Sequence, residues 1–266
     1  MNGKPQKLEY IMCISQQLLL ISTLATGSSL SQADVLGTFT FDQVTANAGG
    51  TTDPTPPPPL PQLTFGSFMA NGLGANPRAS SLFTFSGWTT AAELDAGKYF
   101  ETTLTPALGS QVSFDTITFG VRRSGTGPRD YVVRSSLDNF AANLPAGISP
   151  DNVELQVSGN AFHFVNDNST TQPANVNGST VSLGTDFGPV ADPVTFRIYA
   201  YGAEQSGGTF GVDDVSISGA ISPVPEPEEY AAMFAGSLGV FAWLRRRKNP
   251  SLAVASATVA PDHSAT

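Results

Sequence analysis

The sequence contains one cysteine, Cys13, and two histidines. Because Cys13 lies in the N-terminal segment, the rest of the chain forms no disulfide bond and offers no thiolate as a nucleophile or metal ligand. His163 is the one histidine between residues 34 and 222, which excludes a histidine-rich metal site there. This region must therefore be stabilised by packing.

Basic residues are scarce as well: 13 lysines and arginines stand against 22 acidic residues, giving a net charge of −9 and a pI near 4.5. Such a chain repels nucleic acid, so we exclude a nucleic-acid partner. The G-x-S-x-G, H-E-x-x-H, Walker and G-x-G-x-x-G motifs are missing from residues 34–222. We therefore expect no enzymatic activity, although a glycosidase-type carboxylate pair that meets only in the folded chain remains open.

Helical periodicity is almost absent from residues 34–222, where apolar and polar residues alternate instead. The segment "FDTITFGV" places Phe119 and Val121 on one face, and "TFRIYAYG" does the same with Phe196 and Ile198. Nine to eleven segments of this kind are separated by Gly, Pro, Asn and Asp. They predict an all-β fold, an antiparallel β-sandwich with a jelly-roll-like topology.

Two stretches of this region are not strand-like. Residues 91–97, "AAELDAG", favour one helical turn. Residues 47–61, "NAGGTTDPTPPPPLP", favour an exposed proline-rich loop after the first strand. We treat 34–222 as one domain because no internal repeat is present.

Residues 1–33 have the pattern of a secretory signal peptide. Two lysines precede the apolar stretch "IMCISQQLLLISTLATG", and Ser31 and Ala33 supply small residues before a cleavage site at Asp34. The alternative is a buried N-terminal helix, but the glutamine pair and the abrupt change to strand-like sequence argue against it. The chain is therefore predicted to be exported.

A second apolar segment, "YAAMFAGSLGVFAWL", covers residues 230–244. As a helix it spans roughly 22 Å, less than the ~30 Å of a hydrocarbon core. The cations Arg245, Arg246 and Arg247 that follow complement the helix dipole and favour the cytoplasmic side. We expect one short transmembrane helix that places residues 34–222 outside the membrane; a core helix of the domain is the alternative.

The order of these C-terminal features resembles a known sorting signal. The motif "VPEP", which is Val224, Pro225, Glu226 and Pro227, precedes the apolar segment, and the arginine cluster follows it. Over residues 223–248 this is similar to the PEP-CTERM sorting signal of Gram-negative bacteria. The resemblance implies processing by an exosortase-type enzyme, a precursor held transiently in the inner membrane, and a mature protein at the cell surface or outside the cell. Residues 249–266 extend past the usual end of that signal and are expected to be a disordered tail.

The region before the signal also resembles an ectodomain that recurs in PEP-CTERM proteins, through "KYFETTLTPA", "RSSLDNF", "VTFRIYAYGA" and "GTFGVDDVSISG". This resemblance implies a β-sandwich outside the cell without a defined activity. Two functions stay open: a structural component of the cell surface or extracellular matrix, and a non-catalytic carbohydrate-binding module with extracellular polysaccharide as partner.

The last strand-like segment, "TFGVDDVSISG", contains paired carboxylates. Its apolar positions switch parity at Asp213 and Asp214, which predicts a β-bulge. With Asp42 as a third ligand, if the first and last strands are neighbours, these residues could bind Ca²⁺. The segment is also similar to the closing strand of lectin-like sandwiches. The alternative is two solvated carboxylates at a sheet edge.

Arginines and aromatic residues are the candidates for ligand binding. The arginines of "RRSGTGPRDYVVR" could contact acidic polysaccharide, or could be solvated residues of a hairpin that pair with local acids. Aromatic rings could stack on sugars, although most aromatic residues of a sandwich lie in its core. His163 is expected to be a lone exposed histidine. The candidate residues are Arg122, Arg123, Arg129, Arg134, Trp88, Tyr99, Tyr131, Tyr199 and Tyr201.

Overall fold

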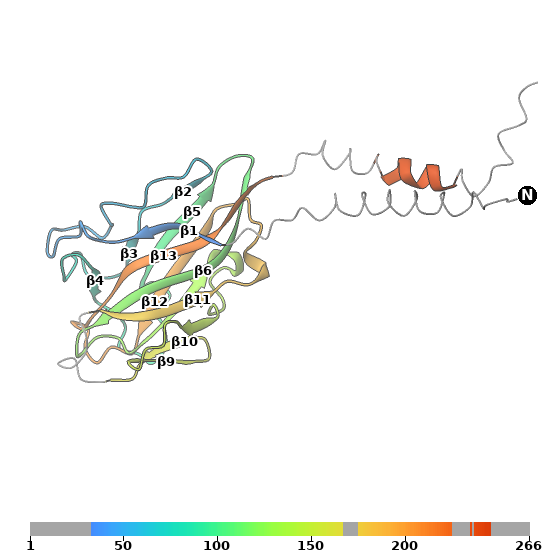
Figure 1. Cartoon of the computed structure of the whole chain (residues 1–266). Helices are drawn as coiled ribbons and strands as arrows, with labels where there is room; N and C mark the ends of the chain where they lie inside the picture. The colour runs from blue at the N-terminus through green and yellow to red at the C-terminus, as the bar shows by residue number, and fades with distance from the viewer. Residues whose placement is uncertain (1–32, 167–174, 225–234, 236, 246–266) are drawn as a thin grey trace, which may run out of the picture. The chain divides into compact units, whose positions relative to one another are not determined.

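The computed structural model describes residues 33–166, 175–224, 235 and 237–245 (Figure 1). The chain divides into two compact units, residues 1–222 and residues 223–266. The strands within the described residues are β1 (Asp34–Phe39), β2 (Leu63–Phe65), β3 (Met69–Asn71), β4 (Phe83–Ser86), β5 (Tyr99–Pro106), β6 (Ser110–Arg123), β7 (Asp130–Ser135), β8 (Ala146–Ile148), β9 (Leu155–Ser158), β10 (Ala161–Phe164), β11 (Val176–Ser182), β12 (Val194–Tyr201) and β13 (Thr209–Pro223).

The strands form two antiparallel sheets. One sheet has the order β1-β13-β6-β11-β8, with β4 also paired to β13. The other has the order β2-β5-β12-β7-β10-β9, with β3 also paired to β5. From β5 to β8 the chain changes sheet at every strand, and β13 returns between β1 and β6, which is the strand order of a jelly roll (Figure 1). The predicted antiparallel β-sandwich is confirmed.

Aromatic side chains fill the space between the sheets. Phe114 of β6 meets Phe196 of β12 edge-on with ring centroids 5.6 Å apart, and Phe119 of β6 meets Phe162 of β10 at 6.1 Å. These pairs arise because alternate residues of each strand point inward, as in β5, where every second side chain is buried. Burial of apolar surface on this scale stabilises the domain without a disulfide bond.

The predicted parity switch is present in β13. Phe210 and Val212 are buried before the switch and Val215 after it, whereas Asp213 and Asp214 between them are partly or fully exposed. Asp214 has a φ of 47°, in the left-handed region that aspartate tolerates better than most residues. The switch divides the strand, because its first part pairs with β4 and its later part with β1.

The short elements differ from the sequence-based expectations. The described residues contain more strands than predicted, because β2, β3 and β8 have three residues each and are too short to show a period. Residues 91–97, predicted to form a helical turn, have bends and turns instead. Two 3₁₀ helices, Ser136–Asp138 and Thr185–Phe187, were not predicted. Residues 47–61 contain no named strand, and Asp53 within them is buried.

The chain enters and leaves the sandwich at the same end. Asp34 at the start of β1 pairs with Gly219 near the end of β13, so the two junctions lie on neighbouring strands (Figure 1). At the other end, Phe39 of β1 pairs with Val215. This arrangement leaves the start of β13, at Thr209, far from both junctions.

Several predicted segments lie partly or wholly outside the described residues. These are the signal peptide at 1–33, residues 225–227 of the sorting motif, Arg246, Arg247 and the tail at 249–266. Within the predicted transmembrane segment, residues 235 and 237–244 are described and helical, and Arg245 continues the helix. In the part of the chain that the structure describes, no helix combines the length and the apolar composition needed to cross a bilayer.

Candidate functional site: a pocket on the outer face of the sandwich

A pocket of about 420 Å³ lies on the outer face of the β5-β12-β7 sheet. Its lining comes from four parts of the chain: the loop before β5, strand β7, the loop after the first 3₁₀ helix, and strand β12. The lining residues are Ala92, Glu93, Leu94, Arg134, Asn143 and Tyr201.

Strand alternation places Arg134 and Tyr201 on this outer face. In β7, Tyr131 and Val133 belong to the core, so Arg134 points the other way. In β12, Ala200 belongs to the core, so Tyr201 points outward from the neighbouring strand. The sheet therefore brings together a guanidinium and an aromatic ring that are far apart in the sequence.

The guanidinium of Arg134 is held in place by two acceptors. Its Nε donates a hydrogen bond to Oδ1 of Asn143 at 2.8 Å, and its Nη1 donates to the carbonyl oxygen of Phe140 at 2.9 Å. It also lies 5.8 Å from the ring centroid of Tyr199, within cation–π range. A planar donor fixed in this way needs little further ordering when a ligand arrives.

Beside the pocket, the side chains of Arg197, Tyr99 and Tyr199 pack against one another in a stack. The Arg197 guanidinium lies 4.1 Å from the ring centroid of Tyr99 and 3.8 Å from that of Phe140, and its Nε donates to Glu101 at 2.9 Å. Burial, and after it the charge of Glu101, raises the pKa of Tyr99 above its usual value. Tyr199 packs on Tyr99 with centroids 5.4 Å apart and is only 2% exposed. This stack supports the pocket but offers no open ring face at Tyr199.

Tyr201 is the half-buried aromatic residue that lines the pocket. Burial and then the negative charge of Asp130 raise the pKa of its hydroxyl, and the positive charge of Arg134 opposes them. Asp130 is also paired with His163, whose Nδ1 lies 2.8 Å from Oδ1 of Asp130. The cross-strand register of β7 and β10, which places His163 opposite Asp130, explains this pair.

The prediction of sugar stacking is wrong for three of the aromatic residues, because their side chains are buried. Trp88 is 1% exposed and donates from its Nε1 to the carbonyl oxygen of Phe85 at 2.9 Å. Tyr131 is fully buried, and Tyr199 is covered by the stack described above. Tyr201 is the member of the predicted set that lines the pocket.

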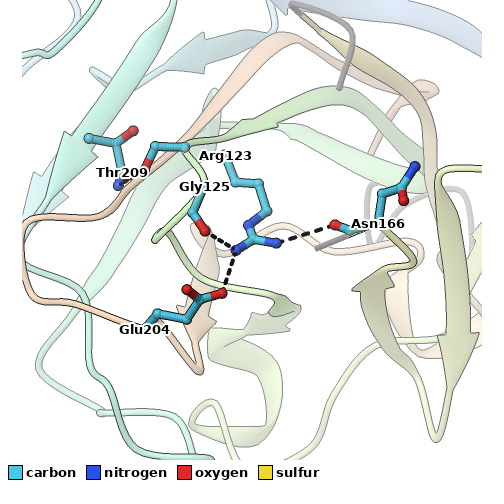
Figure 2. Close-up of polar contacts among 6 residues, drawn as sticks. Arg123, Gly125, Asn166, Glu204 and Thr209 are labelled. Carbon is cyan, nitrogen blue, oxygen red and sulfur yellow. Dashed lines mark hydrogen bonds and ion pairs between the residues drawn. The ribbon is translucent and has the colours of Figure 1, made fainter. Parts of the chain in front are cut away.

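The prediction that Arg123 contacts a ligand is also wrong. Its side chain is 1% exposed and donates to the carbonyl oxygens of Gly125 at 3.1 Å and Asn166 at 3.3 Å, with Glu204 at 3.5 Å (Figure 2). Arg123 therefore ties together three loops at the end of the sandwich. Its neighbour Arg122 is exposed because successive strand residues point to opposite faces. Arg129, in the loop to β7, is partly buried and does not line the pocket.

The predicted Ca²⁺ site is not formed. As expected, β1 and β13 are neighbours, and Asp42 is close enough to influence Asp213. Burial, then the charge of Asp214 and, more weakly, that of Asp42 raise the pKa of Asp213 to about 6. Among the described residues, however, no group of three or more acids, histidines or cysteines is arranged to hold a metal ion. Asp213 instead accepts a hydrogen bond from Nδ2 of Asn175 at 3.0 Å.

The sequence identified Arg134 and Tyr201 as candidates but missed Glu93, Leu94 and Asn143. The missed residues lie in loops, at 91–97 and after Asp138, where no period marks the direction of a side chain. The one available signal was composition, because polar residues near Gly and Asp indicate loops, and loops often carry binding residues.

No family model and no curated protein matches this chain. Among solved structures, it is similar to the K3 cleaved adhesin domain of Lys-gingipain from Porphyromonas gingivalis W83, with 12% identity and a TM-score of 0.32 over 70% of this chain and 99% of that one. The K2 cleaved adhesin domain of Lys-gingipain matches with 14% identity and a TM-score of 0.29, over 68% and 96%. At TM-scores this low, neither match carries a conclusion about fold or function.

Proposed function

We propose that this chain is an exported, non-catalytic protein that displays its β-sandwich at the cell surface or in the extracellular matrix. The proposal rests chiefly on the pairing of Asp34 with Gly219, which puts both junctions of the sandwich at one end. The end of the sandwich that leads into the sorting segment is then also the end with the predicted mature N-terminus, so the opposite end is left available to the surroundings.

Hydrogen bonds connect the loops at that opposite end. They hold in place the surface that a displayed domain would offer to a partner. The backbone N–H of Gly87 donates to Ser206, and that of Glu204 donates to Thr126, each at 3.0 Å. The buried Arg123 adds its contacts to Gly125 and Glu204 (Figure 2). Hydrogen bonds between loops reduce the freedom that binding would otherwise remove.

The C-terminal segment is proposed to act as a sorting signal read by an exosortase-type enzyme, after transient insertion in the inner membrane. Support comes from the sequence order of "VPEP", apolar segment and arginines, and from the helical residues 237–245. Large apolar side chains such as Leu238 and Phe241 are 57% and 63% exposed there, and Arg245 follows them. Apolar surface of this kind is suited to a hydrocarbon environment.

The sorting proposal is tested in a host that has an exosortase. Pro225→Ala with Glu226→Ala removes the motif without changing the apolar segment, so insertion should persist while processing stops. We expect a full-length precursor in the inner membrane, against a shorter mature form at the surface for the unchanged chain. Glu228→Ala with Pro250→Ala, which lie outside the motif, is the matched control and should be processed normally.

Intact mass of the protein from envelope and medium gives the readout, because it locates both cleavage points. A mature N-terminus at Asp34 is expected. Replacing Arg245, Arg246 and Arg247 by glutamine should alter orientation or retention rather than cleavage. If the Pro225/Glu226 double variant reaches the surface in the mature form, the segment is an ordinary membrane anchor.

Carbohydrate binding is the second candidate function, and the outer-face pocket is the observation that favours it. The pocket combines an aromatic ring, a fixed guanidinium, an amide and a carboxylate, from Tyr201, Arg134, Asn143 and Glu93. Surface display and sugar binding are compatible, since a displayed module can hold polysaccharide.

A further inference from the structure

We infer that the pocket formed by Tyr201, Arg134, Asn143 and Glu93 binds a sugar unit of a neutral polysaccharide. This inference deepens the second candidate function, carbohydrate binding, and does not depend on the sorting signal. The pocket's volume of about 420 Å³ falls in the range of roughly 300–1,000 Å³ that small-molecule sites occupy.

The ring of Tyr201 supplies the apolar side of the site. It is the last residue of β12 and points away from the core, and it remains half-buried. A sugar ring has apolar C–H groups on its faces, and an aromatic ring with a polar end suits such an amphipathic ligand. Tyr199, two residues earlier, cannot take this role because Tyr99 and Arg134 cover its ring.

The polar side of the site matches the hydroxyl groups of a sugar, which both donate and accept hydrogen bonds. Arg134 provides donors in a fixed plane, Asn143 provides an amide, and Glu93 provides acceptors. Two hydrogen bonds already hold the Arg134 side chain, so binding costs little additional side-chain entropy.

The loop that lines the pocket before β5 is attached to the strand that carries the tyrosine. The N–H of Gly202 donates to the carbonyl of Ala91 at 2.9 Å, and the N–H of Ala203 donates to that of Thr89 at 3.0 Å. The loop with Ala92, Glu93 and Leu94 is thus linked directly to the end of β12.

The charges around the pocket favour a neutral sugar over a uronic acid. The cation Arg134 is accompanied by the acids Glu93, in the lining, and Asp130, whose charge acts on Tyr201. The whole chain carries a net charge of −9, which repels a polyanion. The arginines that suggested an acidic ligand from the sequence do not gather at the pocket. Arg123 is buried inside the domain, and Arg122 does not line the pocket.

The test is calorimetric titration of the purified full-length protein with hexamers of glucose (β-1,4 and α-1,4), mannose and xylose, and with hexagalacturonate and an alginate hexamer as anionic counterparts. We expect saturable binding of at least one neutral hexamer, and weaker or no binding of the anionic ones. Tyr201→Ala should weaken the binding at least about tenfold, because it removes the aromatic platform. Tyr201→Phe keeps the ring and should bind within about threefold of the original chain.

Glu93→Ala gives a second variant that does not risk the fold, because Glu93 is exposed in a loop. It should also weaken binding, while unchanged thermal unfolding shows that the domain is intact. The inference is overturned if no neutral hexamer binds, if the anionic hexamers bind more tightly, or if Tyr201→Ala and Glu93→Ala bind like the original chain. None of these results bears on export or sorting, which are read from intact mass in cells.

Discussion

The phenolic oxygen of Tyr131 lies 2.8 Å from Oγ of Ser179, across the core between the two sheets. Tyr131 belongs to β7 and Ser179 to β11, and both are fully buried. Burial raises the pKa of Tyr131 far above its usual value, so the hydroxyl stays neutral. A buried hydroxyl requires a partner, and here each residue supplies one to the other.

Tyr131→Phe should therefore destabilise the domain by about 1–2 kcal/mol, because it leaves the Ser179 hydroxyl buried without its partner. Replacing both residues, as Tyr131→Phe with Ser179→Ala, should cost less than the sum of the single changes. Urea unfolding of the three variants measures this coupling. Strictly additive effects would show that the contact does not contribute.

Trp88 is expected to affect stability and not ligand binding. Its ring meets Phe100 and Phe210 edge-on at 5.0 and 5.6 Å, inside the core. Trp88→Ala should cost about 3–5 kcal/mol through the cavity it leaves, and Trp88→Phe less. Chemical denaturation gives the stabilities, and titration of Trp88→Phe with the neutral hexamers should match the original chain. Loss of sugar binding in a folded Trp88→Phe variant would contradict this assignment.

Asp213 should make the stability fall as the pH rises from about 4 to about 6. Its pKa is near 6 in the folded chain against 3.8 for an ordinary aspartate, so the folded state binds the proton more tightly. Ionisation then costs folding free energy, and the cost is fully present above pH 6. Because Asp213 is only partly buried, solvent screening reduces the cost to about 1 kcal/mol.

Asp213→Asn removes this cost and should stabilise the domain at pH 7–8 but not at pH 4. The uncharged amide keeps an oxygen that can accept the hydrogen bond from Nδ2 of Asn175. Thermal unfolding at several pH values is the measurement. Asp192→Asn, at an exposed position, is the control for removing one negative charge from the surface. A gain from Asp213→Asn that is equal at pH 4 and pH 8 would refute the linkage.

Arg123→Lys should loosen the loops at the end of the sandwich. A lysine ammonium lacks the planar fork with which Arg123 reaches Gly125, Asn166 and Glu204 (Figure 2). We expect a loss of about 2 kcal/mol and faster thermolysin cleavage within residues 124–129 and 202–208. Arg122→Lys, at the exposed neighbouring position, should change stability by less than about 0.5 kcal/mol. Equal proteolysis of the two variants would show that Arg123 is not the residue that fastens these loops.

The sequence by itself determined which of the longer segments are strands and which of their faces is buried. Alternation is a property of neighbouring residues, so Phe119 and Val121, or Phe196 and Ile198, identify a buried face before any fold is known. The same reasoning located the parity switch at Asp213–Asp214, because a change of face must appear as a change of parity. These inferences need no knowledge of what lies opposite each strand.

Only the tertiary structure decided which side chains are accessible and which of them meet. Alternation placed Tyr199 opposite the core face, yet Tyr99 and Arg134 of the two adjacent strands cover it, so it is as buried as a core residue. The meeting of Tyr201 and Arg134 with a loop that precedes β5 depends on strand order, which brings distant segments together. Period-two alternation specifies the direction of a side chain relative to its own strand, but exposure depends on the neighbours that the whole fold supplies.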